Sequence, residues 1–167
     1  MKEVIFKPVG VVHTKATSEA IKSRVPGIES VVEVFPDFEP ALEGLETHSH
    51  IFVLGYFHEL RPEQIGPLKV KPRALLRFGV KPEDLPTVGV FSLDSPTRPN
   101  PIGLALVPLN KREANMLHVT GLDFFDGTPV LDIKPYQDSY RVDDYKLPEW
   151  PARLLREGKK AKEHPST

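Results

Sequence analysis

The sequence predicts a mainly β protein: a single β-barrel of short antiparallel and mixed strands with a few short helices. Eighteen prolines among 167 residues are too many for a helical bundle, because proline interrupts helices. Between the prolines lie short runs rich in β-branched and aromatic residues, which are typical of strands. The chain has no Gly-x-Gly sequence and no regular strand–helix alternation, so a Rossmann domain is not expected.

The apolar runs predict eight strands, in chain order at residues 4–13, 31–35, 50–57, 75–78, 88–92, 102–109, 116–122 and 129–133. Their spacing favours closure of the sheet into a barrel. Alternation is clearest around Ile102, Leu104 and Leu106 and over residues 116–122. One face of each of these strands is expected to belong to the core.

Helices are expected at two places. Residues 40–45 could form a short turn, and residues 148–158 predict a C-terminal helix that ends at Gly158. Residues 14–26 are polar with little alternation and predict a long loop of the kind that often carries function. We therefore predict a barrel domain over residues 1–147, followed by a C-terminal helix and basic tail over residues 148–167.

The overall charge does not indicate a nucleic-acid-binding protein. With 22 basic and 23 acidic side chains the net charge is −1, so any RNA contact must use a local patch, and no DNA partner is expected. Two groups are candidates: Lys69, Lys71, Arg73 and Arg77, or the tail residues Arg153, Arg156, Lys159, Lys160 and Lys162. The alternative for both is an ordinary solvated face.

Several kinds of site are excluded or disfavoured by residue usage. The chain has no cysteine, which excludes disulfides, thiolate zinc sites and cysteine nucleophiles. His48, His50 and His58 have no acidic or histidine partner at a recognised ligand spacing, so no metal is expected. No stretch resembles a signal peptide or approaches the length of a membrane span, so the expected location is the cytoplasm.

A proline-rich segment near the middle of the chain stiffens two polar side chains. Prolines at positions 99 and 101 fix their own φ and push Arg98 and Asn100 out of the helical region. A guanidinium and an amide are thus held on a backbone that is ordered before any ligand binds, which lowers the ordering cost of binding. The alternative is a rigid turn with Arg98 in solvent.

The motifs that carry a family resemblance are Arg98-Pro-Asn-Pro-Ile-Gly103, Asp126-Gly-Thr-Pro-Val-Leu-Asp-Ile-Lys-Pro-Tyr136, Pro8-Val-Gly-Val-Val-His13 and Gly44-Leu-Glu-Thr-His-Ser-His50. Through them the chain resembles the tRNA methyltransferases that act on N6-threonylcarbamoyladenosine. The resemblance implies a β-barrel that binds S-adenosylmethionine in a pocket near a homodimer interface. It also implies methylation of N6 of that adenosine, next to the anticodon in the tRNA loop.

Carried over by position, the resemblance implies cofactor contacts at Arg24, Val25, Pro26, His58, Glu59, Leu104, Phe124, Phe125, Asp126 and Gly127. Leu104, Phe124 and Phe125 could wall an adenine slot, and an aromatic face also attracts a sulfonium cation. The alternative for these apolar residues is core packing, and for His58 a structural histidine. Asp126 could instead belong to an ordinary Asp-Gly turn.

The candidate catalytic residues are Asp126, Asn100 and Arg98. Asp126 would act as a general base or as a counter-charge to the sulfonium, Asn100 would orient the acceptor, and Arg98 would neutralise a phosphate or the threonyl carboxylate. Asp94 departs from the resemblance, because the family often has an arginine at this cofactor position. The sequence therefore leaves a second hypothesis open: an S-adenosylmethionine-binding module without tRNA methylation.

Overall fold

The computed structural model describes the backbone of residues 3–163 and the side chains of residues 3–157. Its contacts form two compact units, Met1–Leu60 with Pro101–Arg141 and Arg61–Asn100 with Val142–Thr167, and each unit is described by itself. The predicted division at residue 147 stays a prediction. The contact pattern adds that residues 61–100 group with the C-terminal segment.

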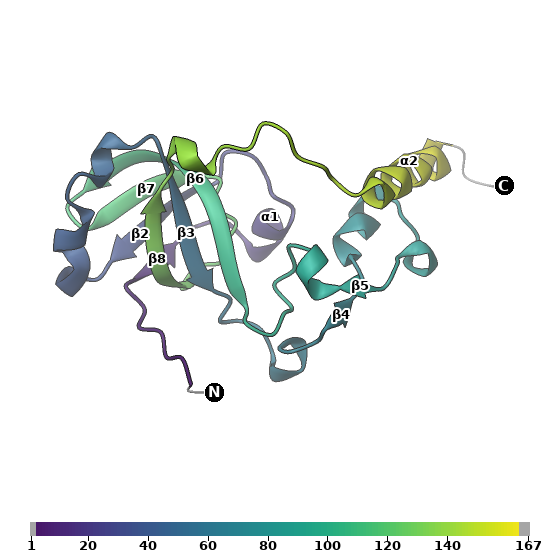
Figure 1. Ribbon diagram of the computed structural model, residues 1–167, viewed down its shortest axis with the longest axis horizontal. Helices are drawn as coiled ribbons and strands as arrows, with labels where there is room; N and C mark the ends of the chain where they lie inside the picture. The colour runs from purple at the N-terminus through teal and green to yellow at the C-terminus, as the bar shows by residue number, and fades with distance from the viewer. Residues whose placement is uncertain (1–2, 164–167) are drawn as a thin grey trace. The chain divides into compact units, whose positions relative to one another are not determined.

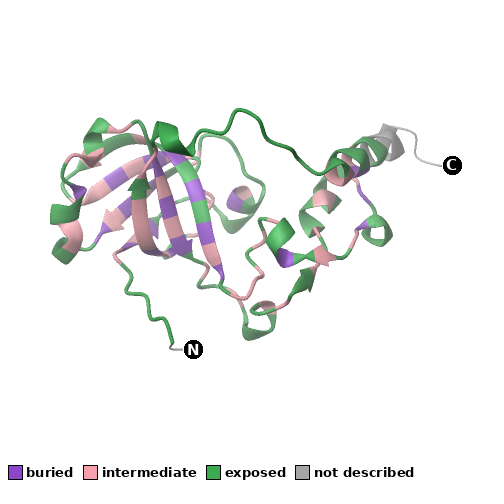
Figure 2. Ribbon diagram, viewed as in Figure 1, coloured by how far each residue is buried: buried purple, intermediate pink, exposed green. Residues whose placement is uncertain are grey.

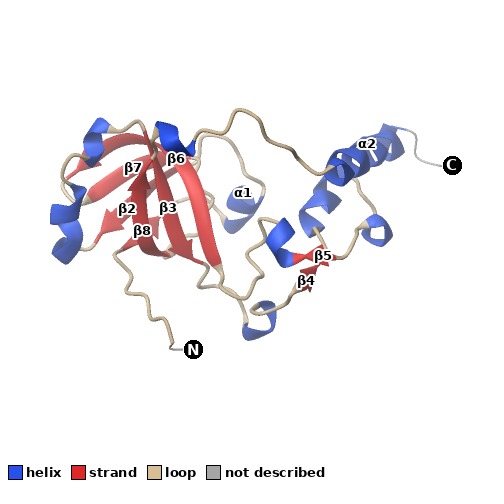
Figure 3. Ribbon diagram, viewed as in Figure 1, coloured by secondary structure: helices blue, strands red, loops and turns tan. Residues whose placement is uncertain are grey.

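The first unit is a closed barrel with the strand order β1-β2-β7-β6-β3-β8 (Figures 1 and 3). Its strands are β1 (Gly10–His13), β2 (Glu29–Val34), β3 (His50–Tyr56), β6 (Ile102–Glu113), β7 (Met116–Thr120) and β8 (Pro129–Pro135). The prediction of a mainly β barrel is confirmed. Of the antiparallel and mixed pairings expected, the barrel shows antiparallel pairing in every neighbouring pair.

The barrel interior is filled by β-branched and aromatic side chains. Val12, Val32, Ile51 and Val53 have no exposed surface, and Phe124 is 1% exposed among them. Strands need residues of this kind on alternate positions, because successive side chains point to opposite faces of the sheet. Figure 2 shows the resulting alternation of buried and exposed bands along the long strand β6.

The buried face of β6 differs from the one that the large side chains suggest. Gly103, Ala105 and Val107 face the interior, whereas Leu104 and Leu106 are 60% and 47% exposed. Small residues lie inside because the Phe124 ring fills the space beside the strand. The leucine face of β6 therefore belongs to the outer wall of the barrel.

Four of the predicted elements are corrected by the structure. Residues 75–78 lie in the 3₁₀ helix η4 (Arg73–Phe78), because Pro72 precedes the run and local hydrogen bonds close it. The long loop at 14–26 contains α1 (Ser18–Lys22), which is capped by the Thr17 hydroxyl. Strand pairing starts only at Gly10 instead of residue 4, and residues 90–92 form a 3₁₀ turn instead of continuing the strand predicted over 88–92.

The remaining short elements of the barrel unit are 3₁₀ helices. They are η1 (Pro36–Leu42), which includes part of the turn expected at 40–45, η2 (Leu45–Thr47) and η7 (Asp138–Tyr140).

The second unit has its own small apolar core, made of Val80, Leu85 and Leu154 with Leu75 and Trp150 packed against it. Its elements are η3 (Pro62–Gln64), β4 (Lys69–Val70), η4, η5 (Pro82–Asp84), β5 (Val88–Gly89), η6 (Val90–Ser92) and α2 (Glu149–Glu163). α2 begins where predicted but runs past Gly158 instead of ending there. Within the described residues, the helices are all too short or too polar to cross a bilayer.

Gly103 provides a test of the barrel packing. A Cβ atom at this position would lie 2.5 Å from Cζ of Phe57 and 2.7 Å from Cε1 of Phe124. We expect Gly103→Ala to lower the free energy of unfolding by about 1–3 kcal/mol, since core rings must shift to admit the methyl group. Chemical denaturation measures this change. Gly89→Ala is the control, because a Cβ atom there meets nothing within 4 Å; equal stability of the two variants would contradict the packing described here.

Candidate functional site

Residues from several predicted motifs gather at one end of the barrel. β1 and β3 end there and β6 and β8 begin there, since the neighbouring strands are antiparallel. The loops at this end hold Arg24, His58, Phe125 and Asp126. Residues separated by up to about one hundred positions are thus brought to one rim by strand order alone.

Asp126 is exposed and its position is fixed by the loop that follows β1. The backbone N–H of Thr14 donates to Oδ1 of Asp126 at 2.9 Å, and the N–H of Gly127 donates to the carbonyl of Val12 at 2.8 Å. The N–H of Thr128 closes a turn on the carbonyl of Phe125, and Gly127 has a φ of 75°. The Asp-Gly turn is therefore real, and it holds the carboxylate at the rim.

His58 lies beside the same turn. A Cβ atom at Gly127 would lie 3.6 Å from Nε2 of His58, so the ring stands directly beside this backbone. His58 and Glu59 are both exposed in the turn after β3. The N–H of Phe57 donates to the carbonyl of Pro101 at 2.8 Å, which fixes the start of that turn.

The two neighbouring phenylalanines have different surroundings. Phe124 is 1% exposed and packs edge-on against Phe57, with ring centroids 5.6 Å apart, so core packing describes its ring. Phe125 is half-buried, and Nζ of Lys22 lies 5.3 Å from its ring centroid. The face of Phe125 therefore already attracts a cation, the Lys22 ammonium, which would have to move aside for a sulfonium to take its place.

Arg24 follows α1 with a backbone φ of 50°, a conformation that few residues other than glycine adopt. Its Nη2 lies 3.2 Å from Oδ2 of Asp123, directly before the two phenylalanines. Strained positions of this kind are often found at functional sites. Val25 and Pro26 continue the same loop and are exposed.

Leu104 is not brought together with the phenylalanine rings within one chain. It pairs with Leu54 on the outer wall of the barrel, while Phe124 lies inside that wall. A slot walled by Leu104, Phe124 and Phe125 is therefore not formed by these side chains alone. Their cofactor contacts stay predictions.

Asp94, Arg98 and Asn100 belong to the second unit. Arg98 is half-buried; its Nη1 donates to the carbonyl of Ser95 at 3.4 Å, and its own carbonyl accepts from the N–H of Gly66 at 3.3 Å. Arg98 is therefore neither fully in solvent nor fully buried, and its role stays a prediction. Asp94 and Asn100 are exposed.

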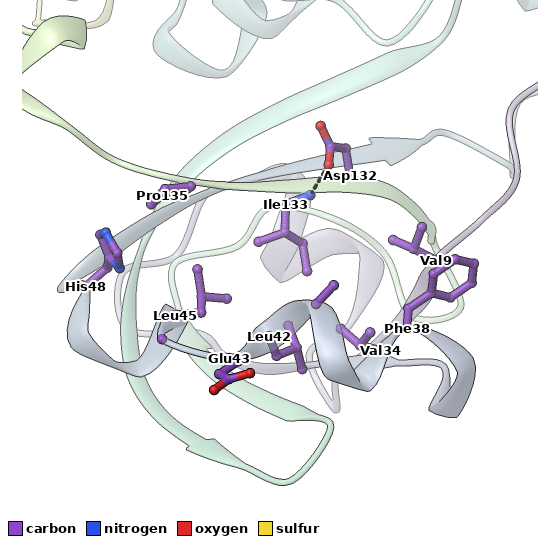
Figure 4. Close-up of a pocket in the computed structure, with 12 residues that line it drawn as sticks. Val9, Val34, Phe38, Leu42, Glu43, Leu45, His48, Asp132, Ile133 and Pro135 are labelled. Carbon is purple, nitrogen blue, oxygen red and sulfur yellow. Dashed lines mark hydrogen bonds between the residues drawn. The ribbon is translucent and has the colours of Figure 1, made fainter.

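A cavity of about 430 Å³ lies at the opposite end of the barrel (Figure 4). Its walls are apolar side chains with Glu43, His48 and Asp132 among them; the full lining is Val9, Val34, Phe38, Ala41, Leu42, Glu43, Gly44, Leu45, His48, Asp132, Ile133 and Pro135. It contains none of the predicted cofactor or catalytic residues. We place the candidate site at the Asp126 end because the motif residues converge there.

An ion pair stabilises the end of the barrel where this cavity lies. Nη1 of Arg112 donates to Oε2 of Glu46 and to the carbonyl of Leu42, both at 2.9 Å. The backbone N–H of Glu46, together with Arg112, keeps the pKa of the Glu46 carboxyl below its ordinary value. These bonds fix η2 against β6.

Three contributors to the site were missed by sequence reasoning: Thr14, Lys22 and Asp123. They act through a backbone N–H, a cation over a ring and an ion pair, and no motif marks such contacts. Their only signal was the position of two of them in the long loop predicted at residues 14–26. Among the residues that the structure describes, no cluster of histidine and acidic side chains is placed to hold a metal ion.

Comparison with known proteins identifies the family. Residues 13–142 match the model of the tRNA-methyltransferase O N-terminal domain. The chain belongs to the TrmO family. A probable S-adenosyl-L-methionine-binding protein of Methanothermobacter thermautotrophicus is 42% identical over 139 residues, which cover 81% of this chain and 92% of that protein. The human tRNA (adenine(37)-N6)-methyltransferase is 37% identical over 145 residues, covering 82% of this chain and 31% of its own length.

Solved TrmO structures share the fold. The crystal structure of TrmO from Pseudomonas aeruginosa superposes with a TM-score of 0.65 at 31% identity, covering 87% of this chain and 62% of that one. This chain therefore spans about three fifths of that TrmO structure and about a third of the human relative.

The bond between Thr14 and Asp126 can be tested by hydrogen exchange. Asp126→Ala removes the acceptor of the Thr14 N–H, whereas Asp126→Asn keeps an amide oxygen at the same position. We expect about fivefold faster exchange of the Thr14 amide in Asp126→Ala, from the loss of a hydrogen bond of about 1 kcal/mol, and little change in Asp126→Asn. NMR-detected exchange measures both rates. Equal rates in the two variants would contradict this description of the loop.

Proposed function

We propose that the chain is an S-adenosylmethionine-dependent tRNA methyltransferase domain that methylates N6 of threonylcarbamoyladenosine next to the anticodon. The observation that carries the proposal is the rim at which a cation-binding aromatic face, Phe125, stands beside the fixed carboxylate of Asp126. Membership of the TrmO family and the names of the similar proteins support the same reaction class and the same cofactor.

The residues at the rim fit the chemical parts of the cofactor. The Phe125 face could take the sulfonium in place of the Lys22 ammonium, and Asp126, the next residue in the chain, supplies a negative charge. Arg24 could pair with the carboxylate of the amino-acid part, a role that Asp94 is unable to take. When bound, S-adenosylmethionine supplies the methyl group.

The acceptor nitrogen explains why a base is needed. N6 of threonylcarbamoyladenosine carries a carbonyl substituent that delocalises its lone pair, so its proton must leave at or near the transition state. Asp126 would accept this proton or act as the counter-charge to the sulfonium. Asn100 would orient the acceptor and Arg98 would neutralise its carboxylate or a phosphate.

We also propose that the chain forms a homodimer. The outer wall formed by β3 and β6 is an apolar face of paired residues: Tyr56 with Ile102, Leu54 with Leu104, and Phe52 with Leu106. Phe52 also packs against Tyr140, with ring centroids 5.0 Å apart, and Tyr140 is itself 47% exposed. Monomeric proteins seldom leave so continuous an apolar face in water. A second copy of the chain would cover it and bring a further wall to the Leu104 position.

The second candidate function is a cofactor-binding module that does not methylate tRNA. Asp94 favours it, because an anion replaces a cation at a predicted cofactor position. Cytoplasmic location stays a prediction for either function.

Methyl transfer to tRNA decides between the two functions. We expect incorporation of radioactive methyl groups from S-adenosylmethionine into tRNA that carries threonylcarbamoyladenosine, and none into tRNA that lacks the threonylcarbamoyl group. Asp126→Asn should lower turnover by about 10²–10⁴-fold if Asp126 is the base. Full turnover of this variant would show that Asp126 is not the base. Calorimetric binding of S-adenosylmethionine without any methyl transfer would favour the binding module.

The dimer has its own test at Leu106, which lies outside the proposed catalytic and cofactor residues. Leu106→Lys places a charge on the apolar face and should weaken dimerisation by at least about tenfold, as measured by sedimentation equilibrium. Leu147→Lys, at a leucine that is 74% exposed outside the barrel, is the control and should leave the dimer intact. A wild-type protein that is monomeric at high concentration would refute the dimer.

A further inference from the structure

Two of the large apolar side chains that the second unit leaves in solvent lie on neighbouring segments. Phe91 is 79% exposed and Leu68 is 70% exposed. They stand on neighbouring segments, because the N–H of Val90 donates to the carbonyl of Leu68 at 3.0 Å and Lys69 pairs with Gly89. Neighbouring apolar side chains in solvent indicate a surface that binds a partner.

Phe91 is presented by a fixed backbone. It lies at the centre of the 3₁₀ turn η6 (Val90–Ser92), in which the Ser92 hydroxyl donates to the carbonyl of Gly89 at 2.7 Å. Val90 is 1% exposed and anchors the turn in the unit. The backbone that carries the ring is thus ordered before any partner binds, which lowers the ordering cost of recognition.

The proline motif is joined to the same surface. The N–H of Gly66 donates to the carbonyl of Arg98, and two residues later the chain reaches Leu68. The segment from Gly66 to Lys69 therefore contacts both the Arg98 segment and the Phe91 turn. We call Leu68, Lys69, Phe91 and Arg98 the Phe91 surface.

The charge of this segment complements a polyanion. Residues 61–100 contain seven basic and four acidic side chains, a net charge of +3, in a chain whose total is −1. Lys69, Lys71, Arg73 and Arg77 are all exposed within it. Basic side chains together with exposed aromatic rings are typical of surfaces that bind single-stranded nucleic acid.

We propose that the Phe91 surface binds an unpaired nucleotide of the tRNA anticodon loop, with one base stacked on the Phe91 ring. The proposal deepens the function above and rests on it for the identity of the RNA. Loop bases can be splayed out and stacked on aromatic rings, and Lys69 and Arg98 would meet the phosphates. A second copy of the chain is a poorer occupant, because a two-fold contact would bring two segments of charge +3 together.

The experiment measures RNA binding directly, with no methyl donor present. The full chain is titrated into a fluorescently labelled anticodon stem–loop RNA and followed by anisotropy. Phe91→Ala and Phe91→Leu should each weaken binding by about tenfold, whereas Phe91→Trp should keep wild-type affinity, because stacking needs a ring and not merely apolar area. Phe6→Ala is the matched control, a phenylalanine that is 61% exposed in the first unit, and should bind as the wild type does.

Each result has a definite meaning. Unchanged RNA affinity in Phe91→Ala would overturn the proposal, as would wild-type affinity in Phe91→Leu or a wild-type chain that does not bind the RNA. A change in sedimentation instead of RNA affinity would assign the surface to a second copy. Phe91-dependent RNA binding without methyl transfer would contradict the proposed reaction but support the Phe91 surface. Methyl transfer with normal RNA affinity in Phe91→Ala would support the reaction and contradict the Phe91 surface.

Discussion

The ring of Phe124 closes one end of the barrel, and the candidate site depends on that closure. Gly55 and Gly103 face each other across β3 and β6, and a Cβ atom on either would lie 2.7 Å or less from a ring carbon of Phe124 or Phe57. Two facing glycines leave space for the buried ring, and the ring occupies it. Phe125 and Asp126 follow directly in the chain, so their positions at the rim are set by this core contact and do not rely on a flexible loop.

The outer wall of the barrel is chemically divided, and the division gives each part a different role. On β1, β2, β7 and the C-terminal end of β6 it carries ion pairs, such as His118 with Glu113 at 2.9 Å, whereas the N-terminal part of β6 is apolar. The Lys111 ammonium, helped by His118, keeps the pKa of Glu113 below its ordinary value, which favours the charged form in water. On β3 and β6 the wall is apolar over successive pairs. The charged wall is stable in water, whereas burial of the apolar wall against another surface would be favourable.

The sequence was sufficient for the barrel but not for which face of β6 is buried. Alternation shows only that the two faces of the strand differ. The small residues face inward because the ring of Phe124, which follows β7 in the chain, fills the core beside them. The strand predicted at 75–78 failed for a local reason, since Pro72 and Gly79 limit the run to a 3₁₀ turn. In the site, motifs indicated Asp126 and His58. The motifs could not indicate Thr14, because it contacts Asp126 through its backbone N–H and lies 112 positions away in the sequence.

Exposure of the rim in a single chain constrains how the proposed reaction would proceed. His58, Asp126 and Val25 are all open to solvent, yet the transfer of a methyl group to a weak nucleophile gains most from fixed charges in a site without water. The proposed reaction therefore requires the rim to be covered when the methyl group is transferred. In the proposed assembly the nucleotide and a second copy of the chain would supply this cover. If the site is complete only when the substrate is bound, the charges that promote methyl transfer are assembled only then. The methyl donor would therefore react less with water between turnovers.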